Sequence, residues 1–368
     1  MARNLPRNVL LLLAVAALFV EPPSGSARAQ LVDPDKLPTA SDRTADKTYA
    51  QRFSEFPILY ATDRVPQSVV GRRESYGSGR ARQISFGSAL ITIPAAHITG
   101  NLELPPISTL EWRLKLPRRP RNKETQFGIE DVKALSKEEW ARLVEQRTGN
   151  DTLLVYIPGR GLSFSDSATQ AAAIGFDLLQ KNILLYSWPA EKLSYVYDRE
   201  SMEASEPYLR QVFEFIAKAP IRRINIVAVG MAANTVLEIM RNDPGIARKL
   251  DNLVLVAPDI DKDKAEHLIR YIRHVRLTVY SDKEDRELRL ATSFWGHPRF
   301  GALPPDQINA AGFDFVVVQP RGELHGEGKA AGILRDIQRL LASNQPPEQR
   351  GLRKVPVSGP LEAYWRLE

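Results

Sequence analysis

The sequence predicts an α/β fold built on a doubly wound, mostly parallel sheet. From residue 153 onward, short apolar runs alternate with amphipathic helical segments. The runs are continuous rather than alternating, as in strands covered on both faces. Two further strand-like segments precede residue 100 with no helix between them, which indicates an antiparallel strand pair at the N-terminal side of the sheet.

The first 29 residues have the pattern of a secretory signal peptide. Arg3 and Arg7 precede an apolar run over residues 9–20, and Ala27-Arg28-Ala29 forms a small-x-small cleavage site. The alternative is an uncleaved anchor, but the run is shorter than the roughly 20 residues that a spanning helix needs. We therefore expect export to the periplasm or the extracellular space, with residues 30–52 as a polar linker.

Composition narrows the classes of function. The chain has no cysteine among its 368 residues, so an exported protein of this sequence is stabilised by core packing without disulfides. The formal charge of +6 is too small and too dispersed to indicate nucleic-acid binding. The densest basic segment runs from Arg113 to Lys123. It is interpreted as a solvated loop, or alternatively as a weak contact with an anionic membrane surface.

The N-terminal part of the main domain, which we place at residues 53–342, begins with strands at 56–64 and 88–93. The intervening residues 65–83 are rich in Gly, Ser and Arg and predict a surface loop. Ser136 and Glu139 have the spacing of a capping box for a helix that reaches about residue 147. Four prolines after residue 343 predict a flexible C-terminal tail over 343–368.

The regular part of the chain supplies six buried strands, expected at 153–157, 183–186, 224–228, 253–257, 277–280 and 315–318. Helices are expected at 166–180, 199–218, 234–241, 262–273 and 334–341. Functional sites of such sheets lie at the carboxyl ends of the strands, so each strand end is a candidate position for a site.

The turn after strand 224–228 is the most informative strand end. In a G-x-S-x-G turn the central serine is a nucleophile, and its strained backbone requires small neighbours. Ala228 and Ala232 keep the small flanking positions, whereas Gly230 stands at the centre. Glycine adopts a positive φ at almost no steric cost. The alternative is an ordinary strand-to-helix turn that contains a glycine.

Four other strand ends carry candidate groups. Asp285 follows strand 277–280 and His325 follows strand 315–318, so turn, acid and histidine occur in the order of an α/β hydrolase. The glycine-rich turn after strand 153–157 can direct backbone N–H groups at an oxyanion, or it is a plain connection. Trp188 either packs or contacts a ligand. No histidine or cysteine spacing supports a metal site, and no cofactor is predicted.

Several segments in this order resemble bacterial alpha/beta hydrolases of the esterase/lipase type. They are residues 60–64 (Tyr-Ala-Thr-Asp-Arg), 187–189, 197–201, 228–234, 257–261 and 285–288. The resemblance implies that Asp285 is the acid and His325 the base of a triad, and that Gly230 replaces its serine. Family members have an A-H-S-M-G-like elbow and an oxyanion-loop histidine, which correspond here to Val229 and Pro158. The implied oxyanion and pocket positions are Pro158, Gly159, Arg160, Gly161, Met231 and Trp188.

The departures from the family pattern concentrate at the active-site turns. Loss of a triad serine costs on the order of 10⁶ in turnover. We therefore expect a catalytically impaired pseudoenzyme that binds a small-molecule or acyl ligand or serves as a scaffold. The alternative is an active ester hydrolase that combines His325 and Asp285 with an activated water or a displaced nucleophile. Candidates for the latter are Ser163, Ser165, Ser187, Ser281 and Asp282.

Overall fold

The structure is a computed structural model that describes residues 53–67, 75–103, 122–149, 151–190, 194–272, 274–318 and 330–367. The predicted signal peptide, the linker, His325 and most of the basic segment ending at Lys123 lie outside the described residues. In the part that is described, no helix combines the length and the hydrophobicity needed to cross a membrane.

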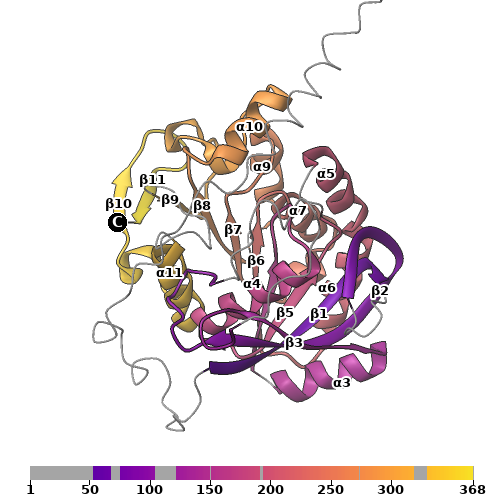
Figure 1. Cartoon of the computed structure of the whole chain (residues 1–368). Coiled ribbons are helices and arrows are strands. Elements are labelled where there is room, and N and C mark those ends of the chain that lie inside the picture. The colour runs from indigo at the N-terminus through magenta and orange to yellow at the C-terminus, as the bar shows by residue number, and fades with distance from the viewer. Residues whose placement is uncertain are drawn as a thin grey trace, which may run out of the picture.

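One eleven-stranded sheet forms the centre of the described chain (Figure 1). Its strands are β1 (Phe53–Gln67), β2 (Ser75–Pro94), β3 (Gly128–Leu135), β4 (Thr152–Ile157), β5 (Ile183–Ser187), β6 (Arg223–Val229), β7 (Leu250–Val256), β8 (Arg276–Ser281), β9 (Asp314–Val318), β10 (Arg353–Pro356) and β11 (Ala363–Leu367). The order across the sheet is β10-β11-β9-β8-β7-β6-β4-β5-β1-β2-β3. The strands from β11 to β1 are parallel, and β2, β3 and β10 pair antiparallel at the two edges. The predicted mostly parallel sheet with an N-terminal antiparallel pair is confirmed.

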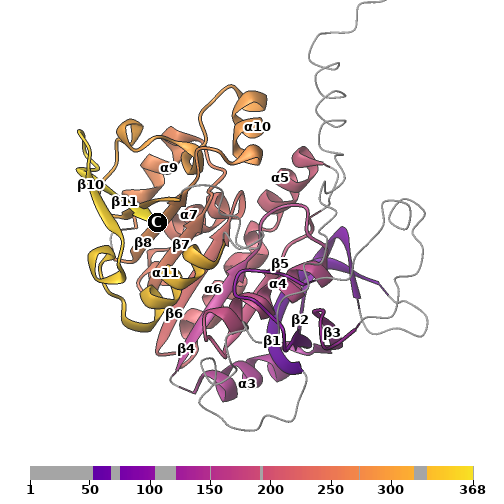
Figure 2. The same cartoon turned by 60° about the vertical axis from the view of Figure 1, so that its left-hand side comes forward.

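Helices cover both faces of the sheet (Figure 2). They are α3 (Lys137–Thr148), α4 (Phe164–Asp177), α5 (Tyr195–Ala204), α6 (Glu206–Lys218), α7 (Ala232–Asn242), α8 (Pro244–Ala247), α9 (Lys262–Ile269), α10 (Arg286–Trp295) and α11 (Ala330–Ser343). One apolar cluster joins the sheet to α4 and α11, and a second joins it to α3, α5, α6, α7 and α9. Successive strand side chains point to opposite faces, so Val155 belongs to one cluster and Tyr156 to the other.

The N-terminal strands are longer than the sequence predicts. The loop expected over 65–83 is largely strand, because β1 continues to Gln67 and β2 begins at Ser75. Register shifts on both sides of Arg64 allow this extension by inserting bulges into the pairing. Cross-strand pairing outweighs the turn preference of the Gly, Ser and Arg residues in this stretch. The sequence analysis also missed β3.

The C-terminal segment was expected to be a flexible tail, and this prediction is wrong for residues 353–356 and 363–367. These residues form β10 and β11, and β11 pairs in parallel with β9. Trp365 is buried. The prolines are compatible with this arrangement because Pro356 lies in the edge strand β10, where proline is tolerated.

Local signals predicted some helix boundaries and missed others. The capping box of Ser136 and Glu139 is present at α3, as predicted. The single helix expected over 199–218 is instead two helices that meet at Ser205. Pro207 explains the break, because proline lacks the N–H that a continuous helix would use and favours the first turn of a new one.

Candidate active site

The turn between β6 and α7 has the backbone conformation that a nucleophile elbow requires. Gly230 stands at its tip with a φ of +59°. Its N–H donates to the carbonyl oxygen of Val256 on the neighbouring strand at 2.9 Å, which fixes the turn against β7. A side chain in this left-handed region would be strained, so glycine is the residue that the turn accommodates best.

A cavity of about 210 Å³ opens in front of this turn. It lies at the carboxyl ends of β4, β6 and β7. In the sheet β5 lies on one side of β4 and β6 lies on the other, so the order of the strands reverses direction at this point. Ligands bind at such switch points in parallel sheets. The described residues that line it are Tyr156, Gly159, Arg160, Leu162, Gln170, Val229, Gly230, Met231, Val256, Ala257, Asp259, Asp285, Glu287 and Leu288. The structure therefore brings together five of the sequence-predicted site residues: Gly159, Arg160, Gly230, Met231 and Asp285.

Asp285 faces this cavity from the start of α10. Its Oδ1 accepts a hydrogen bond from the Leu288 N–H at 2.8 Å, so the carboxylate caps the helix. Burial raises the pKa of Asp285 to about 6; the Leu288 hydrogen bond opposes this shift, and the nearby Glu287 and Asp282 add to it. A carboxyl group with this pKa can exchange a proton near neutral pH. His325 lies outside the described residues.

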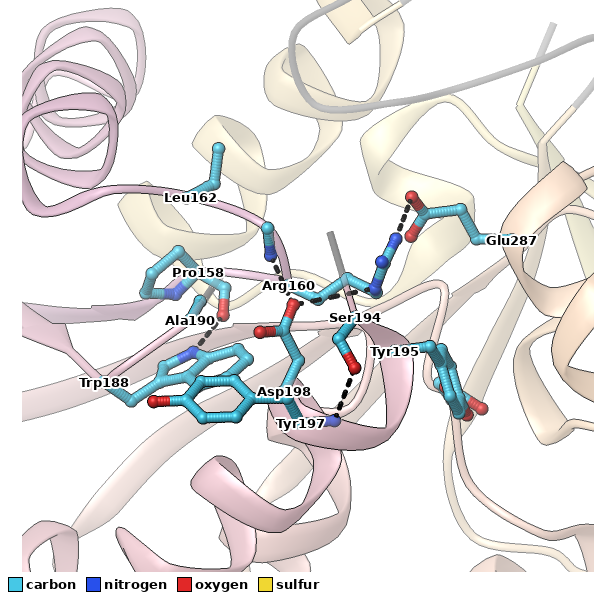
Figure 3. Close-up of polar contacts among 12 residues, drawn as sticks. Pro158, Arg160, Leu162, Trp188, Ala190, Ser194, Tyr195, Tyr197, Asp198 and Glu287 are labelled. Atoms are coloured by element: carbon cyan, nitrogen blue, oxygen red, sulfur yellow. Dashed lines mark hydrogen bonds and ion pairs between the residues drawn. The ribbon is translucent and has the colours of Figure 1, made fainter. Parts of the chain in front are cut away.

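Trp188 supports the β4–α4 loop by a hydrogen bond to Pro158. The Trp188 Nε1 donates to the Pro158 carbonyl oxygen at 2.8 Å (Figure 3). Trp188 is fully buried, and neither residue is among those that line the cavity. The Gly161 N–H donates to Asp198 Oδ2 at 2.9 Å, so it is already engaged by a carboxylate.

Arg64 is a structural residue to which the sequence analysis assigned no role. It is 1% exposed and joins three segments near the cavity. Its Nη2 donates to the Leu162 carbonyl oxygen at 2.6 Å, and its Nε donates to Ser187 Oγ at 2.9 Å. Its Nη1 also reaches the carbonyl oxygens of Gly77 and Ala190, at 3.2 and 3.3 Å. Burial lowers the pKa of Arg64 to about 10, so the side chain is still charged at neutral pH. Its hydrogen bond to Leu162 holds the β4–α4 loop in place.

A second network that the sequence analysis missed surrounds Asp259. Its Oδ1 accepts from Arg299 Nε at 2.5 Å, and its Oδ2 accepts from the Tyr195 hydroxyl at 2.6 Å. Trp295 Nε1 donates to the same Tyr195 oxygen at 3.1 Å. This network connects α5 with α10 across the end of the sheet. The charge of Asp259 is balanced by Arg299, although Asp259 lines the cavity.

The side chains considered as displaced nucleophiles lie elsewhere. Ser187 and Ser281 are buried and hydrogen-bonded to Arg64 and to the Gly301 carbonyl oxygen, respectively. Ser163 caps α4, and Asp282 accepts from the Glu284 N–H. None of these, nor Ser165, lines the cavity in the described part of the chain. In the described part of the chain, no group of three His, Cys, Asp or Glu side chains is placed so that it could hold a metal ion.

A parallel sheet with a tight turn after β6, an acid after β8 and a pocket between them defines the α/β-hydrolase class. The chain belongs to the family described as "Alpha/beta hydrolase of unknown function (DUF900)", whose family model matches residues 133–324. No curated protein matches the chain. Among solved structures, it is similar to the "putative cell surface hydrolase from Lactobacillus plantarum WCFS1". That similarity has 11% identity and a TM-score of 0.36, and covers 55% of this chain and 96% of the other.

Proposed function

We propose that this α/β-hydrolase-fold protein is a catalytically impaired pseudoenzyme that binds a small-molecule or acyl ligand in the cavity in front of Gly230. The observation that carries the proposal is the glycine at the tip of the β6–α7 turn, at a φ of +59°. A triad without its serine loses about 10⁶ in turnover. The absence of Ser163, Ser165, Ser187 and Ser281 from the cavity lining supports the same conclusion.

The alternative function is hydrolysis of an ester by an activated water. One observation favours it: Asp285 lies in the cavity, and burial raises its pKa to about 6. A carboxylate with such a pKa can take a proton from water, alone or through His325. On this alternative, ester turnover depends on Asp285 and needs no serine.

The test is to treat the purified protein with a fluorophosphonate serine probe and to assay it on short-chain aryl esters. The pseudoenzyme proposal expects neither labelling nor turnover above the buffer rate. Robust labelling that is lost in His325→Ala would contradict it. Turnover without labelling, abolished in Asp285→Asn, would favour the activated-water alternative.

We further propose that the protein is exported to the periplasm or the extracellular space. The support is the sequence of residues 1–29, with its basic start, apolar run and small-x-small site. Expression of the full chain in a bacterial host, followed by fractionation and N-terminal sequencing, tests this. The expected product begins at Gln30 outside the cytoplasm, and an uncleaved cytoplasmic product would argue against export.

A further inference from the structure

The cavity contains a guanidinium group whose position is fixed by its surroundings. The Arg160 side chain is 10% exposed. Its Nε lies 3.7 Å from Asp198 Oδ2, and its Cζ lies 5.8 Å from the centre of the Tyr195 ring. At its other end, Nη1 donates to Glu287 Oε1 at 2.9 Å. Figure 3 shows Arg160 extended between the two carboxylates, with Tyr195 beside it.

The two carboxylates that contact Arg160 differ in how firmly they are held. Asp198 is fully buried on α5 and also accepts the Gly161 N–H, so it anchors the arginine from the protein side. Glu287 lies in the first turn of α10, and its side chain is 59% exposed. The Glu287 end of this ion pair is exposed to solvent, whereas the Arg160 end is 10% exposed. A ligand carboxylate that replaces the exposed Glu287 would keep the guanidinium paired, while Asp198 and Tyr195 keep Arg160 in place.

Part of the cavity wall is apolar, and Tyr156 and Gln170 also line the cavity. Leu162, Val229, Met231, Val256 and Leu288 line the cavity. At roughly 30 Å³ for each water-sized group, the cavity of about 210 Å³ accommodates a short chain. Of the other acidic groups in the lining, Asp259 is paired with Arg299, and Asp285 caps α10 with a pKa that burial raises to about 6.

We propose that Arg160 binds the carboxylate of a small aliphatic monoacid, which takes the place of Glu287 while the aliphatic chain lies against the apolar wall. Guanidinium groups bind carboxylates through paired, charge-assisted hydrogen bonds. Glu287 supplies such a carboxylate internally and covers the site when no ligand is bound. This inference rests on the proposed binding function, because it names the ligand class of the same cavity.

The experiment measures binding of hexanoate to the full chain by calorimetry, with 1-hexanol as the uncharged ligand of the same length. Hexanoate should bind the wild type about tenfold or more tightly than hexanol, since it alone gains charge-assisted hydrogen bonds. Arg160→Gln should weaken hexanoate binding by a similar factor and leave hexanol binding unchanged. Glu287→Gln should strengthen hexanoate binding several-fold, because the competing internal carboxylate is gone. Arg286→Gln, on the same helix but outside the cavity lining, is the matched control and should change neither affinity.

Equal affinities for hexanoate and hexanol would overturn the proposal, as would unchanged hexanoate binding in a folded Arg160→Gln protein. If Arg160→Gln does not fold, the Glu287→Gln variant provides the test. In that case, a hexanoate affinity of Glu287→Gln that is no higher than that of the wild type would overturn the proposal. The fluorophosphonate assay on the same wild-type sample keeps the two proposals separate. Labelling contradicts the pseudoenzyme proposal, whereas the hexanoate series alone decides the role of Arg160.

Discussion

The Cα atom of Gly159 lies 4.0 Å from the position that a Cβ atom at Gly230 would occupy. This is an ordinary van der Waals separation, and apart from the two chain neighbours of Gly230 no atom of the described residues is nearer. The β4–α4 loop and the β6–α7 turn therefore leave space for a side chain at the tip of the elbow. The cost of a substitution at Gly230 comes from its backbone conformation.

Gly230→Ser should destabilise the protein by about 1 kcal/mol, because a residue with a Cβ atom is strained at this φ. It should also hydrolyse short-chain aryl esters at least about tenfold faster than Gly230→Ala, since only serine restores the hydroxyl of the triad. Urea denaturation and an ester assay provide the two measurements. Equal rates for the two variants would show that the acid, base and oxyanion turn are not arranged for acyl transfer.

Arg64→Met should lower the free energy of unfolding by about 3 kcal/mol, because it leaves several buried oxygens without the charged donor that they share. The affected acceptors include the Leu162 and Ala190 carbonyl oxygens and Ser187 Oγ. Urea denaturation measures the loss. Arg82→Met, at an exposed position of β2, is the control and should change stability by less than about 0.5 kcal/mol. Similar losses in the two variants would contradict the anchoring role of Arg64.

Asp285→Asn should stabilise the protein at pH 8 but not at pH 4. Burial raises the pKa of Asp285 from 3.8 to about 6 in the folded protein. Between these values the unfolded chain loses the proton that the folded state keeps, so wild-type stability falls as the pH rises through this window. Asparagine keeps an acceptor for the Leu288 N–H and removes the buried charge. The gain at pH 8 should be about 2 kcal/mol.

The measurement for Asp285 is the difference in unfolding free energy between wild type and variant at each pH, which cancels the titration of other groups. Asp306→Asn, at an exposed position, should show no such pH-dependent difference. A constant difference between pH 4 and pH 8 for Asp285→Asn would contradict the raised pKa.

His97→Gln should destabilise the protein at pH 6 and progressively less toward pH 9.5. His97 Nδ1 lies 2.8 Å from Glu103 Oε2, and Nε2 lies 3.0 Å from Asp177 Oδ1. Burial alone would lower the pKa of His97, but the hydrogen bonds and charges of these two carboxylates outweigh it and raise the pKa to about 9. The stabilisation is therefore complete below pH 6.5 and is lost as the pH rises through 9.

The loss in His97→Gln should be about 2–3 kcal/mol at pH 6, measured by urea denaturation over this pH range. His267→Gln, at an exposed position of α9, should leave the profile unchanged. A wild-type profile that does not fall toward pH 9.5 relative to His97→Gln would show that His97 is neutral in the folded protein.

The parts of the structure that could be predicted from the sequence have local signals. Continuous apolar runs identify the parallel strands, and the spacing of Ser136 and Glu139 identifies the start of α3. The order of Gly230 and Asp285 along the chain also indicated that they would lie in one pocket, because the carboxyl ends of parallel strands meet at one edge of the sheet.

The parts that could not be predicted depend on contacts between distant segments. Arg64 and Leu162 are separated by 98 positions, and Asp259 and Arg299 by 40, so no spacing in the sequence indicates that they pair. The edge strands β10 and β11 were missed because they are short and lie among prolines. Their formation depends on pairing with β9, which a local pattern does not record.

The parallel pairing of β11 with β9 has a consequence for how the chain folds during synthesis. Of the described strands, β11 is the last to emerge from the ribosome, and it covers one edge of β9. Until then β9, which is buried in the finished fold, presents a row of unpaired backbone N–H and C=O groups at its open edge. Such edges promote aggregation. A chaperone that holds the polypeptide until residues 363–367 are available would thus protect its most vulnerable surface.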